Sequence, residues 1–316
     1  METIRLGQDG PSVTPLCIGT WAWGDKLFWN YGSHYGSEQV REAFKVALEA
    51  GITFFDTAEI YGFGLSEDLL GQFMQQSDQP MQIATKYGPA PWRFTAQSVS
   101  DALTASLKRL GVERVALYQV HWPFSFFMSQ ETLMNALADE VKRGRIEAVG
   151  ISNYSADEMR QAHQLLAARG VRLAVNQVRY SLLSRQIESN GILHTARQLG
   201  VTILAYSPLT QGLLTGKYTP DSSETPRDAR RIDPRFSKNG LKKIEPVIAL
   251  LRQVGEKHGR TPAQVALNWL IAQGNVIPIA GAKTGEQVRQ NAGALGWRLS
   301  DEELAQIDQV SRPWLN

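Results

Sequence analysis

Four residues that suit proton transfer lie within about a fifth of the chain: Asp56 and Tyr61 in FFDTAEIYG, Lys86 in IATKYG and His121 in LYQVHWP. A tyrosine hydroxyl has a pKa near about 10 in water, and a desolvated ammonium beside it stabilises the phenolate. We therefore expect Lys86 to lower the pKa of Tyr61 towards that of a useful proton donor. A phenol tuned in this way suits protonation of the oxygen during reduction of a carbonyl group.

Each of these residues also has an ordinary structural interpretation. For Asp56 and Lys86 alone, a salt bridge that ties two strands together explains the pair equally well, because a buried carboxylate needs a cationic partner. A lone tyrosine in a loop is commonly a plain aromatic, and a lone histidine in an apolar strand is commonly a hydrogen-bonded core residue. The catalytic interpretation depends on the four residues being brought together.

The elements that could gather them are eight apolar segments of strand length, which alternate with amphipathic segments of helix length. They begin at Leu16, Ile52, Gln82, Val115, Ala148, Leu173, Thr202 and Val276, after an N-terminal β-hairpin expected from residues 3–6 and 13–16. Eight parallel strands close a barrel, and such barrels do their chemistry at the C-terminal rim. We predict an α/β fold, a (β/α)8 TIM barrel forming a single domain over residues 1–316, with the four residues at one rim.

Helix starts and one long loop complete the predicted framework. Capping boxes are expected at Ser155 with Glu158, Thr261 with Gln264, Thr284 with Gln287 and Ser300 with Glu303. Segment 216–240 is polar, rich in Pro and Arg, and too long for an ordinary connection. It predicts a functional loop or lid after the seventh strand.

The composition favours a small-molecule partner. The 33 basic and 31 acidic residues give a net charge of +2, too weak a field to indicate nucleic acid or an anionic membrane as partner. Cys17 is the only cysteine, which excludes an internal disulfide, and no pair of histidines has metal-ligand spacing, so no metal site is expected. Neither a signal-like start nor a membrane-length apolar run is present, and we expect a cytoplasmic protein.

Polar residues at other strand ends indicate where a cofactor would bind. No GxGxxG follows a strand, so a Rossmann site is not supported. After the eighth strand, Lys283 precedes a helix start whose free amides and positive end favour an anion, although a plain capped helix is the alternative. Gln177, Ser152 and Asn153 could hold a flat amide such as nicotinamide, and Tyr206 could stack beneath its ring.

Four tryptophans follow strands or lie in their loops: Trp21, Trp23, Trp92 and Trp122. Because tryptophan is costly to expose, either these loops pack on one another or the aromatic side chains line a pocket. We favour the pocket.

The sequence resembles the aldo-keto reductase superfamily nearly end to end. The segments GTWAWG, FFDTAEIYG, IATKYG, LYQVHWP and IPIAGAKTGEQVRQN occur in the family's order. The resemblance implies that the barrel binds NADPH, in extended form, across its C-terminal face. It also implies that Tyr61 is the acid and that Lys86, held by Asp56, lowers its pKa. His121 would orient the substrate carbonyl.

The resemblance assigns further site residues. Cofactor contacts at the nicotinamide end would be Gly19, Thr20, Trp21, Asp56, Ser152, Asn153, Gln177 and Tyr206. The pyrophosphate loop would contain Ser207, Pro208, Leu209, Gln211, Gly212 and Lys217, with Arg227 closing over it. The adenosine end would contain Gly281, Lys283, Gln287, Gln290 and Asn291. The substrate pocket would contain Trp23, Tyr61, Trp92, His121 and Trp122.

Within the superfamily, the phosphate-site pattern is more similar to the branch of potassium-channel beta subunits and bacterial general reductases than to that of aldose reductase. GTWAWG with a later Trp29, PWRFT and LTGKYTP also look like plant-type pyridoxal reductases. Lys283 would favour NADPH over NADH by pairing with the ribose phosphate. One departure is Ala116, where many relatives carry an acidic residue.

The resemblance implies NADPH-dependent reduction of aldehydes to alcohols, with ketones as a further substrate class and a pyridoxal-like aldehyde as a candidate. The main alternative is an NADPH-sensing regulatory subunit with little turnover, because channel subunits retain the same four residues. A sugar isomerase or lyase would need a metal cluster or a Schiff-base lysine, and Lys86 is the only lysine placed for that role. The sequence does not predict the oligomeric state.

Overall fold

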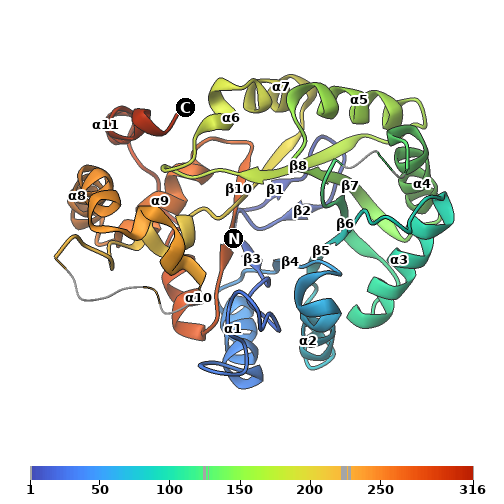
Figure 1. Cartoon of the computed structure of the whole chain (residues 1–316), viewed down its shortest axis with the longest axis horizontal. Coiled ribbons are helices and arrows are strands. Elements are labelled where there is room, and N and C mark those ends of the chain that lie inside the picture. Colours follow the sequence, from blue (N-terminus) through green and yellow to red (C-terminus); the bar gives the residue numbers. More distant parts are fainter. Residues whose placement is uncertain (1, 124–125, 127, 222–225, 227–228, 316) are drawn as a thin grey trace.

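Eight parallel strands form a closed barrel in the computed structural model of the chain, which describes residues 2–123, 126, 128–221, 226 and 229–315 (Figure 1). In order around the barrel they are β3 (Cys17–Gly19), β4 (Phe54–Asp56), β5 (Gln82–Tyr87), β6 (Val115–Val120), β7 (Ile146–Ser152), β8 (Leu173–Arg179), β9 (Thr202–Tyr206) and β10 (Val276–Gly281). β10 pairs with β3 and closes the ring. The predicted barrel and all eight predicted strand segments are confirmed.

Amphipathic helices surround the strands (Figure 1). They are α1 (Ser37–Glu49), α2 (Leu65–Met74), α3 (Ala96–Leu110), α4 (Gln130–Lys142), α5 (Ala156–Ala167), α6 (Gln186–Ser189), α7 (Ile192–Leu199), α8 (Lys238–His258), α9 (Pro262–Ile271), α10 (Gly285–Ala292) and α11 (Asp301–Ser311). Val99, Leu103 and Leu107 form a stripe along α3, and all three are buried. Among the described helices, none has the length and apolar character needed to cross a bilayer.

Three of the four predicted capping boxes are present, at Ser155, Thr261 and Ser300. The fourth capping box, predicted at Thr284 with Gln287, is wrong in its second hydrogen bond. Thr284 accepts a hydrogen bond from the backbone of Gln287, but the Gln287 Oε1 accepts from the backbone N–H of Lys283 (2.7 Å). The Gln287 side chain therefore fixes the turn that carries Lys283.

The predicted N-terminal hairpin is present but shorter, with strands β1 (Ile4–Arg5) and β2 (Ser12–Val13). Leu6 and Val13 belong to the apolar cluster inside the barrel, and the Gly7 N–H donates to the Thr202 hydroxyl (2.9 Å). The hairpin therefore packs against the barrel and contributes to its interior core.

The barrel interior changes from apolar to polar towards its C-terminal end. Phe54, Ala84 and Leu117 belong to the interior apolar cluster. Because successive side chains of a strand point to opposite faces, the side chains two residues later also point inwards. These later side chains are Asp56, Lys86 and Gln119, all buried.

The polar segment 216–240 contains two short helical turns, η3 (Ala229–Ile232) and η4 (Pro234–Phe236), and the first turn of α8. Ser237 caps α8 by accepting a hydrogen bond from the Gly240 N–H (3.1 Å). Arg227, predicted to close over the pyrophosphate loop, lies outside the described residues.

Candidate active site

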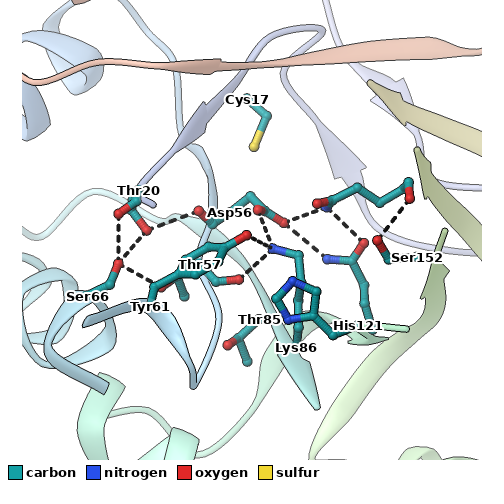
Figure 2. Close-up of polar contacts among 12 residues, drawn as sticks. Cys17, Thr20, Asp56, Thr57, Tyr61, Ser66, Thr85, Lys86, His121 and Ser152 are labelled. Atoms are coloured by element: carbon teal, nitrogen blue, oxygen red, sulfur yellow. Dashed lines mark hydrogen bonds and ion pairs between the residues drawn. The ribbon is translucent and has the colours of Figure 1, made fainter. Parts of the chain in front are cut away.

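Lys86 on β5 forms hydrogen bonds with two other predicted catalytic residues, Asp56 at the end of β4 and Tyr61 in the connection that follows β4. Its side chain is fully buried, and Nζ donates to Asp56 Oδ1 (2.5 Å), the Thr57 carbonyl oxygen (2.8 Å) and the Tyr61 hydroxyl (3.3 Å) (Figure 2). An ammonium group has three hydrogens, and these three acceptors use all of them. Tyr61 accepts from Lys86, so the phenol keeps its own hydrogen for another acceptor.

Burial raises the pKa of Tyr61 above its ordinary value, and the Lys86 ammonium lowers it only in part. The lowering effect predicted for Lys86 is therefore present, but burial outweighs it and the net pKa of Tyr61 does not fall. Burial also lowers the pKa of Lys86, but Asp56 and Tyr61 more than offset that effect, so its pKa is raised. At neutral pH, Tyr61 is a neutral phenol beside a charged ammonium. The phenol therefore has a proton to donate, and the ammonium can stabilise the phenolate that would result.

The second oxygen of Asp56 is held by two carboxamides. Asp56 Oδ2 accepts from Gln119 Nε2 (3.1 Å) and from Gln177 Nε2 (2.8 Å). Gln177 Nε2 also donates to Gln119 Oε1 (3.1 Å). Both hydrogens of the Gln177 amide are thus used, which leaves its Oε1 as an acceptor.

Gln119 is a site residue that the sequence prediction missed. A Cβ atom added to Gly150 on β7 would lie 2.7 Å from Gln119 Cγ, so a glycine is required where the Gln119 side chain passes. The signal was present in VALYQV, because the alternation that points Leu117 inwards also points Gln119 inwards.

The loop that carries Tyr61 is anchored to the next loop by an ion pair. Glu59 accepts from Arg93 Nη1 (2.5 Å) and from the backbone N–H of Gly88 (2.6 Å). Tyr61 begins the short helix η1 (Tyr61–Gly64), in which Gly62 has φ 57° and lies against the Gly24 carbonyl. These contacts fix the backbone on both sides of the phenol.

His121 lies beside the phenol and carries no charge at neutral pH. Its ring centroid is 5.7 Å from that of Tyr61, and it stacks on Trp122 at 4.0 Å. Burial, together with the Lys86 charge, lowers the pKa of His121 to about 2. Nδ1 is buried and has no hydrogen-bond partner among the described residues.

This low pKa predicts an acid-dependent loss of stability. In the unfolded chain, His121 binds a proton below its ordinary pKa of 6.5, whereas in the folded protein its pKa is about 2. Neutral His121 therefore makes its full contribution to the free energy of unfolding above the ordinary pKa. Between the two pKa values, that free energy falls by about 1.4 kcal/mol for each unit by which the pH drops. We expect His121→Asn to lose less stability than wild type between about pH 7 and pH 5 in urea titrations. Parallel pH dependences for the two proteins would contradict the buried neutral histidine.

The predicted nicotinamide residues form one hydrogen-bonded group at the ends of β7, β8 and β9. Ser152 Oγ donates to the Gln177 carbonyl (2.9 Å), and Asn153 Nδ2 donates to Ser152 Oγ (3.1 Å) and the His121 carbonyl (3.2 Å). The Tyr206 hydroxyl donates to Asn153 Oδ1 (3.0 Å). Asn153 has φ 63°, in the left-handed region. This conformation is energetically unfavourable for residues other than glycine and is enriched at functional sites.

The predicted contacts at the end of β3 have different surroundings. The Thr20 hydroxyl is buried and bonded to the Asp56 carbonyl (3.1 Å) and Ser66 Oγ (2.8 Å), so it supports the strand that carries Asp56. Gly19 is required by packing, because a Cβ there would lie 2.8 Å from Ile279. Trp21 reaches the rim, with its ring centroid 6.2 Å from that of Tyr61.

The predicted pyrophosphate loop has a strained backbone. Ser207, Thr210 and Gln211 have φ values of 53°, 48° and 56°, and Gly212 has φ 99°. The short helix η2 (Thr210–Thr215) is preceded by Pro208 and Leu209 and is followed by Lys217. This run of left-handed conformations distinguishes the loop from an ordinary connection.

The predicted adenosine residues surround the turn from β10 into α10. The Asn291 amide donates to the Gly281 carbonyl (3.4 Å), and Gln290 Nε2 donates to Glu286 (3.0 Å). Lys283 Nζ lies over two aromatic rings, 4.5 Å from the centroid of Trp29 and 4.6 Å from that of Tyr35.

The four tryptophans predicted to line a pocket separate into different environments. Trp23 is fully buried, donates to the Ala282 carbonyl (2.8 Å) and packs against Phe55 and Phe73, so it belongs to the core outside the barrel strands. That placement corrects its assignment to the substrate pocket. Trp92 is 74% exposed at the β5–α3 connection.

Trp21 lies near Tyr61 and forms an aromatic cluster with Phe28 and Trp29, in which the ring centroids are within 5.4 Å of one another in pairs. Phe28 was missed, because no periodic pattern marks its place in an irregular loop.

Comparison with known proteins identifies the family. The family model described as Aldo/keto reductase family matches residues 15–312. The chain belongs to the aldo/keto reductase family. This aldo/keto reductase is therefore an oxidoreductase, as the sequence predicted.

Its relatives include proteins named as reductases. It is 38% identical to the chloroplastic pyridoxal reductase of Arabidopsis thaliana, over 98% of this chain and 86% of that protein. It is 33% identical to the Schizosaccharomyces pombe aldo-keto reductase yakc [NADP(+)], over 98% and 91% of the two chains. A solved glycerol dehydrogenase from Gluconobacter oxydans superposes with a TM-score of 0.85 at 30% identity, over 99% and 96%.

Proposed function

We propose that this aldo/keto reductase reduces aldehydes, and ketones as a further class, to alcohols with NADPH, and that Tyr61 is the general acid. One observation carries the assignment. The buried Lys86 ammonium donates to the Tyr61 oxygen at 3.3 Å, so the phenol hydrogen is left for a substrate oxygen. The family membership supports carbonyl reduction as the reaction class.

The side chains have distinct roles in this proposal. Bound NADPH supplies the hydride. Tyr61 donates its proton to the oxygen of the carbonyl group, and Lys86 stabilises the phenolate that remains. Neutral His121 orients the carbonyl through a ring nitrogen, and Asp56 holds Lys86 in place.

The residues present fit the cofactor. The oriented Gln177 Oε1 can accept from the nicotinamide carboxamide, next to Ser152 and Asn153. The strained loop from Ser207 to Gly212 would hold the pyrophosphate, and Lys283 would pair with the phosphate on the ribose. Tyr206 would lie beneath the nicotinamide ring.

A flat aromatic aldehyde suits the rim. Trp21 and Trp122 lie near Tyr61 and His121, and their faces can pack against an aromatic substrate. The relative at 38% identity is a pyridoxal reductase, so pyridoxal is the first candidate. Trp92 stays a predicted substrate contact.

Oxidation of NADPH with a panel of aldehydes, ketones and pyridoxal tests the function. We expect stoichiometric alcohol formation, with aromatic aldehydes giving a higher kcat/KM than short aliphatic ones. Tight NADPH binding without turnover on any carbonyl would contradict the enzyme and favour the NADPH-sensing alternative.

Lys283 gives a separate prediction about cofactor choice. Lys283→Ala is expected to raise the KM for NADPH by about 10-fold or more, because a charge-assisted bond to phosphate contributes roughly 1.5–3 kcal/mol. The KM for NADH should change little, since NADH lacks that phosphate. Equal increases for both cofactors would rule out the phosphate role.

A further inference from the structure

We infer that Trp29 is a selectivity residue for the cofactor: together with Tyr35 it holds the Lys283 ammonium in position for the 2′-phosphate of NADPH. The inference rests on the proposed phosphate role of Lys283. It adds a residue from the β3–α1 loop to the ribose-phosphate contact, which the sequence assigned to Lys283 after β10.

The contacts place Lys283 against two aromatic faces. Its Nζ lies 4.5 Å from the centroid of Trp29 and 4.6 Å from that of Tyr35, within the range of cation–π attraction. Lysine has a flexible four-carbon stem, and fixing it costs conformational entropy. Two rings that hold the ammonium before the phosphate arrives reduce that cost, which is the general effect of preorganisation.

The two rings are themselves fixed by the loop. The Tyr35 hydroxyl donates to the Ala22 carbonyl (2.6 Å). Asp25 Oδ1 accepts from the backbone N–H of Phe28 (2.7 Å) and Trp29 (3.3 Å). The aromatic faces are therefore part of a folded loop.

Trp29 also meets a second cation. The Arg230 guanidinium lies over its ring at 5.6 Å, and Arg230 Nη1 donates to the Gln211 carbonyl (2.8 Å) in the predicted pyrophosphate loop. One indole thus contacts cationic groups from the loops after β9 and β10. Neighbouring Phe28, in contrast, packs against the rings of Trp21 and Trp29.

Calorimetric titration with adenosine 2′,5′-bisphosphate and with 5′-AMP tests the inference without turnover. Wild type should bind the bisphosphate more tightly. Trp29→Leu should weaken bisphosphate binding by about 3- to 10-fold and leave 5′-AMP binding nearly unchanged, a size expected for one cation–π contact. Phe28→Leu is the matched control from the same loop, and it should preserve the preference.

A double-mutant cycle separates this role from general support of the loop. In a Lys283→Met background, Trp29→Leu should have no further effect on bisphosphate binding, because the ring acts through the ammonium. A persisting effect, or an equal loss for 5′-AMP, would overturn the inference and indicate direct stacking on adenine or a structural role. No bisphosphate preference in wild type would instead refute the phosphate role of Lys283, and the carbonyl reductase proposal would remain open to its own test.

Discussion

Tyr61→Phe is expected to lower kcat for aldehyde reduction by about 10²- to 10⁴-fold, the usual contribution of a general acid. The phenol oxygen lies 3.3 Å from Lys86 Nζ and has one hydrogen left to donate. Phenylalanine fills the same space but cannot protonate the carbonyl oxygen. The Kd for NADPH, measured by fluorescence titration, should stay within about twofold, because the proposed cofactor contacts do not involve this hydroxyl.

Tyr118→Phe provides the matched control. Tyr118 is a buried tyrosine on β6 whose hydroxyl has no hydrogen-bond partner among the described residues. Its loss should leave turnover near the wild-type value. If Tyr61→Phe retained a tenth or more of wild-type kcat, Tyr61 would not be the acid.

Lys86→Met is expected to abolish turnover and to destabilise the fold by about 3–5 kcal/mol, the usual cost of breaking a buried ion pair. Lys86 is 0% exposed and Asp56 is 2% exposed, so neither charge can be solvated by water when its partner is removed. The Gln119 and Gln177 amides would still donate to Asp56, but they carry no charge. Urea unfolding measures the change in stability.

The double variant Lys86→Met/Asp56→Asn separates stability from catalysis. Removing the unpaired carboxylate should restore most of the lost stability, because the remaining groups are neutral. Turnover should stay abolished, since the phenolate still lacks its cation. A Lys86→Met protein as stable as wild type would show that the pair is not the buried charge cluster described.

The sequence was sufficient to predict the barrel and the convergence at its rim. Apolar runs bounded by turns mark the eight strands, and parallel strands bring their C-terminal ends to one edge. Asp56, Lys86 and His121 lie at or just beyond such ends, so their gathering follows from topology. The assignment of Tyr61, which lies in the loop after Asp56, came from the resemblance of FFDTAEIYG to the family.

Features that depend on how deeply a side chain is buried, or on the direction in which it points, could not be predicted from the sequence. The pKa of Tyr61 depends on how far the surrounding protein removes the phenol from water, and this desolvation outweighs the Lys86 charge. Trp23 points into the outer core because of the path of an irregular loop. Gln287 bonds one residue earlier than a capping box requires, which only the turn geometry reveals.

A crystal structure of the complex with NADP⁺ tests the central claim most directly. The account predicts that the nicotinamide carboxamide donates to Gln177 Oε1 and that its reactive carbon lies beside the Tyr61 hydroxyl, with Lys86 still bonded to Asp56. A nicotinamide bound away from this rim, or a Tyr61 hydroxyl turned away from it, would contradict the account.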